Sequence, residues 1–507
     1  MLKISDYIAM MLSFIAMLIF YLIFAGSLSV NLGISNSLDP VELPEDFSVI
    51  RESNVEEPVY AVLCGGQGES ERTKNMIQML SNLKKEYAVF STVDEISSKQ
   101  AETLETILVT AEGWDEIGNK ELLFQYVEES GKNLIFTGLL EGTEAEEYDK
   151  LIGIIKKDDI VQIKGIMLFE GMFIQDDMVY FDELEMDVRQ IAVDARCKKL
   201  MVEKTKNPVE QRNLIPLIWE KRYGEGCFYV VNGDFFTMEK GMGILTGILS
   251  RTQEDFIYPV VNAKAELLDS FPELDNPYDN QMKNMYSRDT YMFLRDIVWP
   301  SIVKLGESDT LIFSTRLNKP VKKEDQENYN YLAGLLEKRG YEIDDSLTEK
   351  ELEIPYVSSG HQRKEEEIFQ MQSGISGWGL ATHYLDISQV MGRNAGDSEY
   401  EWASYSLELS KMMHDLYKET DWMDAMTVSQ ALERYKRYLL LEPVITSGEG
   451  QLTVETGNFY DMCFYMIRTE KTVLAGEGYE VQKVGENAYL VKALQEKIVI
   501  GLKEKPE

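Results

Sequence analysis

The sequence predicts an α/β protein that begins with a membrane-spanning segment and ends in a small all-β region. Three observations lead to this prediction. Residues 7–38 carry no charged side chain, short apolar runs alternate with amphipathic stretches from Val59 onward, and closely spaced strand patterns follow Pro443. A helix needs about 20 mostly apolar residues to cross a bilayer. Buried strands separated by helical periods are typical of parallel sheets with crossover helices.

The predicted membrane anchor covers residues 1–38, and we expect residues 7–30 to lie in the bilayer. Only the terminal amine and Lys3 precede the apolar run, and the chain beyond it begins with the acidic stretch Asp39-Pro-Val-Glu-Leu-Pro-Glu-Asp. Because cytoplasmic flanks hold the excess of Lys and Arg, this asymmetry favours a single-pass protein of the cell membrane whose large C-terminal part is extracytoplasmic.

The alternative for this segment is a cleaved signal peptide. The small residues Ala25-Gly26-Ser27 offer a cleavage point. However, the apolar run is longer than the usual signal core of about 7–15 residues, and few basic residues precede it. We therefore expect a retained anchor.

Composition limits the class of partner. The 507 residues include 87 acidic and 51 basic side chains, which give a net charge of −36. Nucleic-acid binding needs clustered cations, so this charge argues against it. The acidic surface serves solubility, or it attracts a cationic partner such as a polysaccharide with free amines. The four cysteines are too scattered for a disulfide framework or a zinc motif, so buried free thiols are expected.

The chain between the anchor and residue 253 predicts a linker and one α/β domain. Residues 39–57 are rich in acids and prolines and predict an extended spacer. Residues 58–253 predict a flavodoxin-like domain, with residues 161–174 and 178–194 as a hairpin insertion. The expected strands are 59–64, 88–93, 106–111, 133–138 and 226–232, and the expected helices are 69–86, 121–129 and 241–250. The glycine-rich loop after Cys64 predicts a tight turn, because it lacks the spacing of a phosphate-binding loop.

Four sequence stretches then resemble a known family. They are Asp255-Phe-Ile-Tyr-Pro-Val-Val-Asn-Ala-Lys-Ala-Glu-Leu-Leu-Asp269-Ser270-Phe-Pro, Asn232-Gly-Asp234-Phe-Phe, Arg295-Asp-Ile-Val-Trp299-Pro and Ala425-Met-Thr-Val-Ser-Gln-Ala-Leu-Glu-Arg-Tyr435. Together they resemble the polysaccharide deacetylase-like proteins encoded with membrane-bound exopolysaccharide synthesis systems, including the Pel type. The resemblance covers residues 58–445. It implies a glutamine amidotransferase-like domain over residues 58–253 and a deformed (β/α) barrel of deacetylase type over residues 254–443. The strand patterns of residues 444–507 add a β-sandwich-like cap.

The resemblance also implies a zinc site, and this sequence departs from it. Active relatives carry two adjacent aspartates at the end of the first barrel strand and two histidines spaced H-x-x-x-H. Here the aspartate pair reads Asp269-Ser270, and the segment 339–345, where the histidine pair would be expected, contains no histidine. The resemblance implies His383 as the residue that survives from the site. The alternative is a histidine whose hydrogen bonds are satisfied near the barrel rim.

Metal and cofactor binding are therefore not expected. The chain has three histidines, His361, His383 and His414, and their spacing presents no pair of imidazoles from one element. Zinc held by His361, His383 and Asp269 across the barrel is the remaining alternative. An amidotransferase activity is excluded, because the turn 136–142 has no cysteine nucleophile and the domain has no histidine.

Two hydrolytic chemistries have weaker support. A Ser-His-Asp triad built on His361 with Ser358 or Ser359 lacks the nucleophile elbow of such enzymes. Paired carboxylates of a glycosidase that include Asp269 stay open, because barrel sites lie at strand ends and the chain is rich in acids.

Aromatic residues point to sugar binding. Flat rings with polar rims suit sugar-binding clefts. We expect Trp378 and Trp402 near a loop or mouth, and the predicted ligand-binding set is Asp269, His383, Trp378, Trp402 and Trp299.

The sequence thus predicts a membrane-anchored, non-catalytic scaffold or glycan-binding subunit of an exopolysaccharide synthesis or export system, with proteins of that system as partners. The first alternative is a divergent polysaccharide deacetylase or hydrolase. The second is a signalling or adhesion ectodomain.

Overall fold

The computed structural model describes residues 40–44, 47–50, 57–66, 70–143, 145–169, 171–174, 178–205, 213–316, 319–344 and 358–505. None of the helices within these ranges combines the length and the apolar character that a bilayer crossing requires. The predicted anchor, residues 1–38, lies outside the described residues, so the prediction of a membrane span stays a prediction.

Among the described residues, the first sheet has nine strands, and its parallel half has a flavodoxin-like order. The strand order is β2-β1-β3-β4-β11-β10-β9-β6-β7, in which the first five strands are parallel. These five are β1 (Tyr60–Leu63), β2 (Tyr87–Phe90), β3 (Thr106–Val109), β4 (Asn133–Phe136) and β11 (Gly226–Val231). The associated helices are α2 (Glu71–Asn82), α3 (Ser98–Thr103), α4 (Lys120–Glu128), α5 (Ala145–Leu151) and α6 (Met238–Thr252). The predicted strands of this half are confirmed.

An antiparallel extension completes the first sheet. It consists of β10 (Pro216–Tyr223), β9 (Lys198–Glu203), β6 (Ile166–Leu168) and β7 (Val179–Phe181). The predicted hairpin insertion, residues 161–174 and 178–194, contains the antiparallel pair β6–β7 and the strand β8 (Met186–Val193). Strand β8 pairs with β5 (Ile154–Ile163), and among the described strands these two pair only with each other. The sequence did not predict β9 and β10. Their charged runs, Lys198-Lys199 and Glu220-Lys-Arg222, interrupt the apolar pattern on which a strand prediction depends.

The second sheet is fully parallel and has five strands, in the order β15-β14-β13-β17-β16. Their bounds are β13 (Ala263–Asp269), β14 (Phe313–Thr315), β15 (Glu342–Ile343), β16 (Ser358–Ser359) and β17 (Leu380–Asp386). The helices of this part are α7 (Asp279–Tyr286), α8 (Thr290–Phe293), α9 (Trp299–Ser308), α10 (Gln326–Lys338), α11 (Glu365–Trp378), α12 (Trp402–Tyr417) and α13 (Val428–Leu440). Where a deformed barrel was expected, the described strands form an open sheet.

The C-terminal region is a sandwich of two four-stranded antiparallel sheets, as the strand patterns predict. One sheet has the order β12-β20-β23-β22 and the other β18-β19-β24-β21. The strands are β12 (Asp255–Val260), β18 (Glu442–Gly448), β19 (Gln451–Gly457), β20 (Cys463–Thr469), β21 (Thr472–Val473), β22 (Tyr479–Gly485), β23 (Ala488–Ala493) and β24 (Lys497–Lys503).

The strand β12 corrects one expectation. The resemblance places Asp255–Val260 at the opening of the barrel, but β12 pairs antiparallel with β20 of the sandwich. Strand β12 therefore belongs to the C-terminal sandwich, although in the sequence it directly precedes β13 of the parallel sheet. Local sequence cannot reveal this, because the strand's partner lies about 200 residues away.

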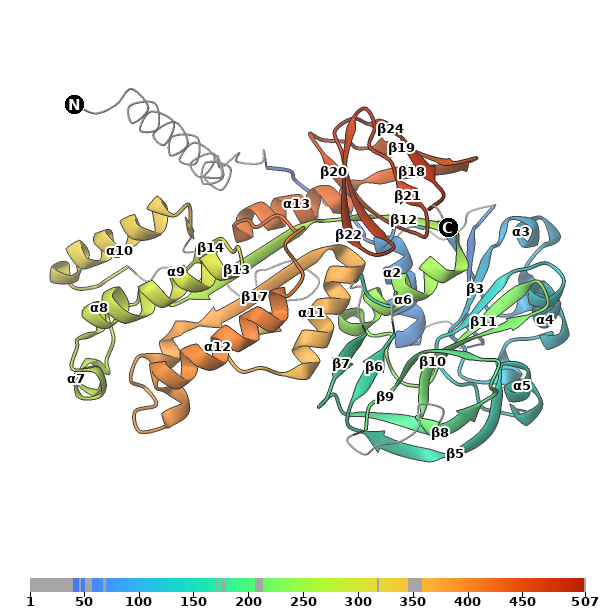
Figure 1. Cartoon of the computed structure of the whole chain (residues 1–507), viewed down its shortest axis with the longest axis horizontal. Helices are drawn as coiled ribbons and strands as arrows, with labels where there is room; N and C mark the ends of the chain where they lie inside the picture. The colour runs from blue at the N-terminus through green and yellow to red at the C-terminus, as the bar shows by residue number, and fades with distance from the viewer. Residues whose placement is uncertain are drawn as a thin grey trace, which may run out of the picture.

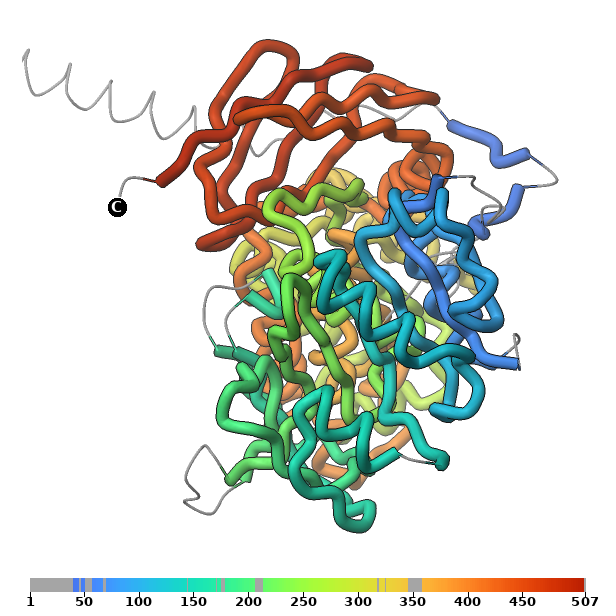
Figure 2. Tube along the Cα trace, turned by 90° about the vertical axis from the view of Figure 1, so that its right-hand side faces the viewer, coloured from blue at the N-terminus to red at the C-terminus, as the bar shows by residue number. Residues whose placement is uncertain are grey.

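The three parts share a continuous core, seen as one body in Figures 1 and 2. Helix α6 of the first part packs against α11 of the second, and the amide of Gly243 donates to the hydroxyl of Ser373 (2.9 Å). A methyl group on Gly243 would lie 2.7 Å from the Cα of Ser373. Glycine at this position therefore permits the close approach of the two helices.

The described parts of the predicted spacer are packed rather than free. Val41 and Leu43 are half-buried while Glu42 and Pro44 are exposed, and Phe47 and Val49 also face inward. Leu43, Phe47 and Val49 pack against the main core. These residues of the predicted spacer therefore lie against the folded part of the protein, because their alternating apolar side chains find a buried surface.

Candidate functional site

The carboxyl edge of the five-stranded sheet gathers polar side chains. Strand β13 ends at Asp269 and the neighbouring strand β17 ends at Asp386, and these two residues are register partners. Sites in parallel α/β folds lie at this edge, where the loops that leave the strands converge. The edge thus places two carboxylates on adjacent strands.

Asp269 is held by three contacts. The hydroxyl of Tyr384 donates to its Oδ2 (2.6 Å), and the amide of Ser270 donates to its Oδ1 (2.7 Å). The guanidinium of Arg316, just beyond β14, lies 3.7 Å from Oδ2. Ser270 has a φ of +58°, so the chain turns sharply directly after the aspartate. These contacts fix the carboxylate at the strand end.

A third carboxyl group experiences the charge of the first two. Burial raises the pKa of Glu273, and the negative charges of Asp386, Asp269 and Asp275 raise it further. All four carboxyl-bearing residues are partly buried. A positive charge beside them would oppose this repulsion.

His383 lies away from this cluster. In the parallel register it pairs with Glu266, three positions before Asp269, so its side chain lies on the opposite face of the sheet from Asp269. Its Nδ1 lies 2.8 Å from Oε1 of Glu266, and its Nε2 donates to the carbonyl of Gly360 (2.9 Å). Tyr417 donates to Oε2 of Glu266 (3.1 Å). Both ring nitrogens are therefore engaged within the core.

The Glu266–His383 pair is fully buried and retains protons. Burial raises the pKa of Glu266, against the opposing charge and hydrogen bond of His383. Burial lowers the pKa of His383, but the charge and hydrogen bond of Glu266 and the Gly360 carbonyl reverse this, so the net pKa is raised. Nε2 must carry a proton, because it donates to the carbonyl of Gly360. A second proton then lies between Nδ1 and the carboxyl group of Glu266.

A zinc ion does not fit this donor set. The alternative ligand set combined His361, His383 and Asp269, but both nitrogens of His383 are occupied and the ring lies on the other face of the sheet from Asp269. Within the described ranges, no group of three or more His, Cys, Asp or Glu residues is placed to hold a metal ion. We therefore derive no metal-dependent step for this site.

His361 is the histidine nearest the edge in sequence register. It lies two residues after Ser359, the last residue of β16, which pairs with Tyr384. Its ring is buried and stacks on Tyr405 at 4.0 Å between centroids, and within the described part of the chain its Nε2 has no hydrogen-bond partner. Burial lowers its pKa, and Lys364 adds to this while Glu408 opposes it. A neutral imidazole therefore packs beside the strand ends.

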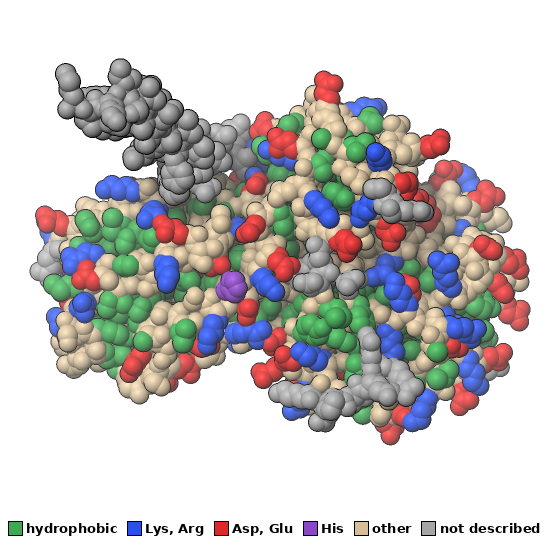
Figure 3. Space-filling model, viewed as in Figure 1, with side chains coloured by type: hydrophobic (Ala, Val, Ile, Leu, Met, Phe, Trp, Pro, Cys, Tyr) green, Lys and Arg blue, Asp and Glu red, His purple; other side chains and the backbone are tan. Residues whose placement is uncertain are grey.

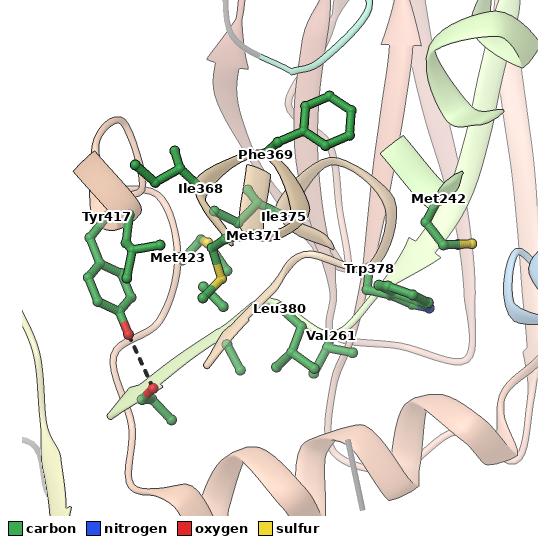
Figure 4. Packing of buried hydrophobic residues seen from close by; sticks show 14 of the residues in the cluster. Met242, Val261, Ile368, Phe369, Met371, Ile375, Trp378, Leu380, Tyr417 and Met423 are labelled. Atoms are coloured by element: carbon green, nitrogen blue, oxygen red, sulfur yellow. Dashed lines mark hydrogen bonds between the residues drawn. The ribbon is translucent and has the colours of Figure 1, made fainter. Parts of the chain in front are cut away.

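The three predicted tryptophans occupy different positions. Trp378 is 1% exposed and lies in the core between Met242 and Val261 (Figure 4). Trp402 is buried at the start of α12, where it contacts Phe293 edge-on. Neither lies at a mouth, because helical spacing turned both rings inward. Trp299 is half-buried, and its ring stacks on that of Phe271 with 6.4 Å between centroids and an interplanar angle of 5°. Phe271 lies two residues after Asp269 in the sequence.

Sequence reasoning missed most of the residues around Asp269. Glu273, Arg316, Tyr384 and Asp386 were not predicted as site residues. The available signal was positional, since Asp386 and Arg316 directly follow apolar strand patterns, as Asp269 does. With 87 acidic residues in the chain, this signal could not be separated from ordinary surface acids. On the face seen in Figure 3, acidic and basic side chains are interspersed.

Cavities in the described part of the protein include two that lie away from this edge. The larger, about 910 Å³, lies between the first sheet and the C-terminal sandwich and is lined by charged residues that include Glu220, Arg251, Arg468 and Lys471. Arg468 is buried and donates to the carbonyls of residues 171–173. The smaller, about 730 Å³, lies beside the β5–β8 hairpin.

The fold and site describe a multi-part α/β protein with an acidic strand-end site and a β-sandwich cap. This chain belongs to the family described as "uncharacterised protein conserved in bacteria (DUF2194)", which matches residues 155–331 and 337–490. No curated protein sequence matches the chain.

Solved structures resemble the chain at low identity. One is Agd3, described as a novel carbohydrate deacetylase, at 9% identity and a TM-score of 0.49, covering 87% of this chain and 98% of that one. Another is the exo-β-1,4-mannosidase Op5Man5 from Opitutaceae bacterium strain TAV5, at 16% identity and a TM-score of 0.26. That match covers 36% of this chain and 32% of that one. A third is a ThuA-like protein from Bacteroides uniformis, at 8% identity and a TM-score of 0.29. That match covers 39% of this chain and 94% of that one.

Proposed function

We propose that this protein is a non-catalytic glycan-binding or scaffold subunit of an exopolysaccharide synthesis or export system. Its N-terminal segment anchors it in the cell membrane, and the rest is extracytoplasmic. One observation carries the proposal: the strand-end site holds clustered carboxylates, while the histidine expected to survive from a zinc site is locked into a buried pair.

The acidic cluster selects for a positively charged sugar. Asp269, Glu273 and Asp386 together place more negative charge at the edge than Arg316 neutralises. A protonated amine of a polymer sugar would favour the ionised form of Glu273. The expected ligand is therefore a polysaccharide with free amino groups rather than an acetylated or an acidic one.

The charge argument also gives a pH dependence. Glu273 has a raised pKa in the free protein, so below that pKa it must lose a proton before it can pair with an amine. Binding should therefore strengthen as pH rises through the pKa of Glu273, until the sugar amine itself loses its proton.

The test is calorimetric binding of defined oligosaccharides to the full chain in detergent. Partly deacetylated N-acetylglucosamine oligomers should bind about tenfold or more tightly than fully acetylated ones of equal length, as a charge-assisted hydrogen bond implies. Glu273→Gln should weaken amine binding while it raises the stability of the free protein, because it removes like-charge repulsion. Glu496→Gln, on the exposed face of the cap, is the matched control and should change neither.

Other outcomes would support one of the alternative functions or refute the proposed ligand. Metal-dependent release of acetate from an acetylated oligomer would establish the divergent deacetylase and overturn the non-catalytic proposal. Equal binding of acetylated and deacetylated oligomers would refute the role of the acidic cluster. Absence of binding to any glycan would favour the signalling or adhesion ectodomain.

A further inference from the structure

The first described residues after the predicted anchor form a docked segment, residues 40–44 and 47–50. Side chains in this segment alternate between half-buried and exposed, as in a strand that lies on a surface. Leu43, Phe47 and Val49 pack against the main core. Such alternation is what a chain bound along one side shows, whereas a free spacer would have no buried face.

One hydrogen bond attaches the docked segment to helix α13. The amide of Val41 donates to Oε2 of Glu433 (2.7 Å). Glu433 is largely buried and also binds Lys436, one turn further along the helix (2.8 Å). The acceptor is therefore held in place by its own helix. The amide of Phe47 donates to the carbonyl of Pro44 (2.9 Å), so a turn follows the attached stretch.

Figures 1 and 2 both show the docked segment beside α13 and the C-terminal sandwich. In both views the β5–β8 hairpin lies on the opposite side of the molecule. The docking site therefore marks one side of the protein as the side from which the anchor departs.

We expect residues 7–30 to lie in the bilayer, and the docked segment begins at Pro40. The intervening residues 31–39 can span at most roughly 30 Å when fully extended. This short reach keeps the docked side of the protein close to the bilayer surface.

We propose that the docked segment orients the protein on the membrane, so that α13 and the adjoining end of the sandwich face the lipid surface and the β5–β8 hairpin points away from it. This inference rests on the membrane anchor of the proposed function. Strand β13 runs along the long axis of the molecule in Figure 1, so the orientation leaves the carboxyl edge and its acidic site at the side of the protein. That edge is then open to a polymer that moves along the membrane.

The test is energy transfer from the full chain, reconstituted in lipid nanodiscs, to acceptor lipids. Donor dyes are attached to Glu442→Cys, directly after α13, or to Asp159→Cys on the β5–β8 hairpin. Both positions are exposed. The background carries Cys197→Ser and Cys227→Ser, since the other two cysteines are buried. Transfer from position 442 should clearly exceed transfer from position 159.

A variant pair tests the cause of the orientation. Leu43→Ser with Phe47→Ser removes the inward apolar face of the docked segment and should abolish the difference between the two dye positions. Glu42→Gln with Ser48→Ala changes outward side chains of the same segment and should preserve it. Circular dichroism of both variants shows whether the fold is kept.

Each outcome has a distinct meaning. If the chain does not enter the nanodisc, the membrane anchor and this inference both fail. If it enters and the two dyes transfer equally in the unchanged segment, only the orientation is overturned. The orientation by the docked segment is likewise overturned if the difference survives in a folded Leu43→Ser/Phe47→Ser variant.

Discussion

Replacement of His383 by alanine distinguishes a structural histidine from a ligand-binding one. Both His383 and Glu266 have fully buried side chains, joined at 2.8 Å. The replacement leaves the Gly360 carbonyl and one carboxyl oxygen without their donor and opens a cavity. Loss of one partner of a buried pair typically costs about 3–5 kcal/mol. We therefore expect His383→Ala to lower the free energy of unfolding by about that amount.

Urea unfolding of the full chain, followed by far-ultraviolet circular dichroism, measures this change. His414→Ala is the matched control, because His414 is 70% exposed and lies 3.8 Å from Asp309. Its effect should stay within about 0.5 kcal/mol. In the His383→Ala background, Glu266→Gln should restore part of the lost stability, since a neutral amide is less costly to bury than an unpaired carboxylate.

The opposite result would refute this reasoning. If His383→Ala cost less than about 1 kcal/mol and removed glycan binding or bound metal, the histidine would be a ligand-binding residue rather than a core one.

Buried groups elsewhere in the molecule give three more predictions. Trp378→Ala should lower the free energy of unfolding by about 3–5 kcal/mol in urea unfolding, without loss of glycan binding, because the ring fills the core and not the strand-end site. Arg468→Ala should cost about 3 kcal/mol or more by the same assay, since it leaves the carbonyls of residues 171–173 without their donor. His361→Gln should reduce the loss of stability on acidification: the folded-state pKa of His361 is lowered, so its contribution is complete above about pH 6.5 and is lost as pH falls towards the folded pKa.

Controls for the first two use residues of the same kind. Trp299→Ala, at a half-buried ring, should cost less than Trp378→Ala. Arg196→Ala, whose partner Asp194 is on the same exposed turn, should cost little. An unchanged pH dependence in His361→Gln would mean that the imidazole is protonated as easily in the fold as in the unfolded chain.

The parallel half of the first sheet was predictable because its signals are local. Apolar runs between turn residues mark β1 to β4, and helix α13 begins at a capping box on Thr427 that is visible in the sequence. The C-terminal strands were predictable for the same reason. By contrast, β12 was assigned to the wrong sheet, since the pairing with β20 depends on chain far away.

At the candidate site, too, some features follow from local sequence and others depend on contacts between distant parts of the chain. The resemblance pointed to Asp269 at the end of a strand, but its partners Tyr384 and Arg316 come from β17 and from the residue after β14. Trp378 and Trp402 were expected at a mouth because glycines and polar residues surround them, yet the packing of α11 and α12 buries both rings. A neighbouring polar residue in sequence says little about which face of a helix a ring occupies.

The sequence by itself determined the uncharged stretch 7–38, the strands of the parallel half of the first sheet, most strands of the C-terminal region, the acidic excess and the lack of a histidine pair. Only the tertiary structure decided which carboxylates meet at the sheet edge, that His383 pairs with Glu266 on the other face, and that the residues after the predicted anchor bind α13. The physical reason is that the periodicity of apolar residues is a property of neighbouring residues in the sequence. Proximity between strand ends depends instead on register and packing between residues that are far apart in the chain.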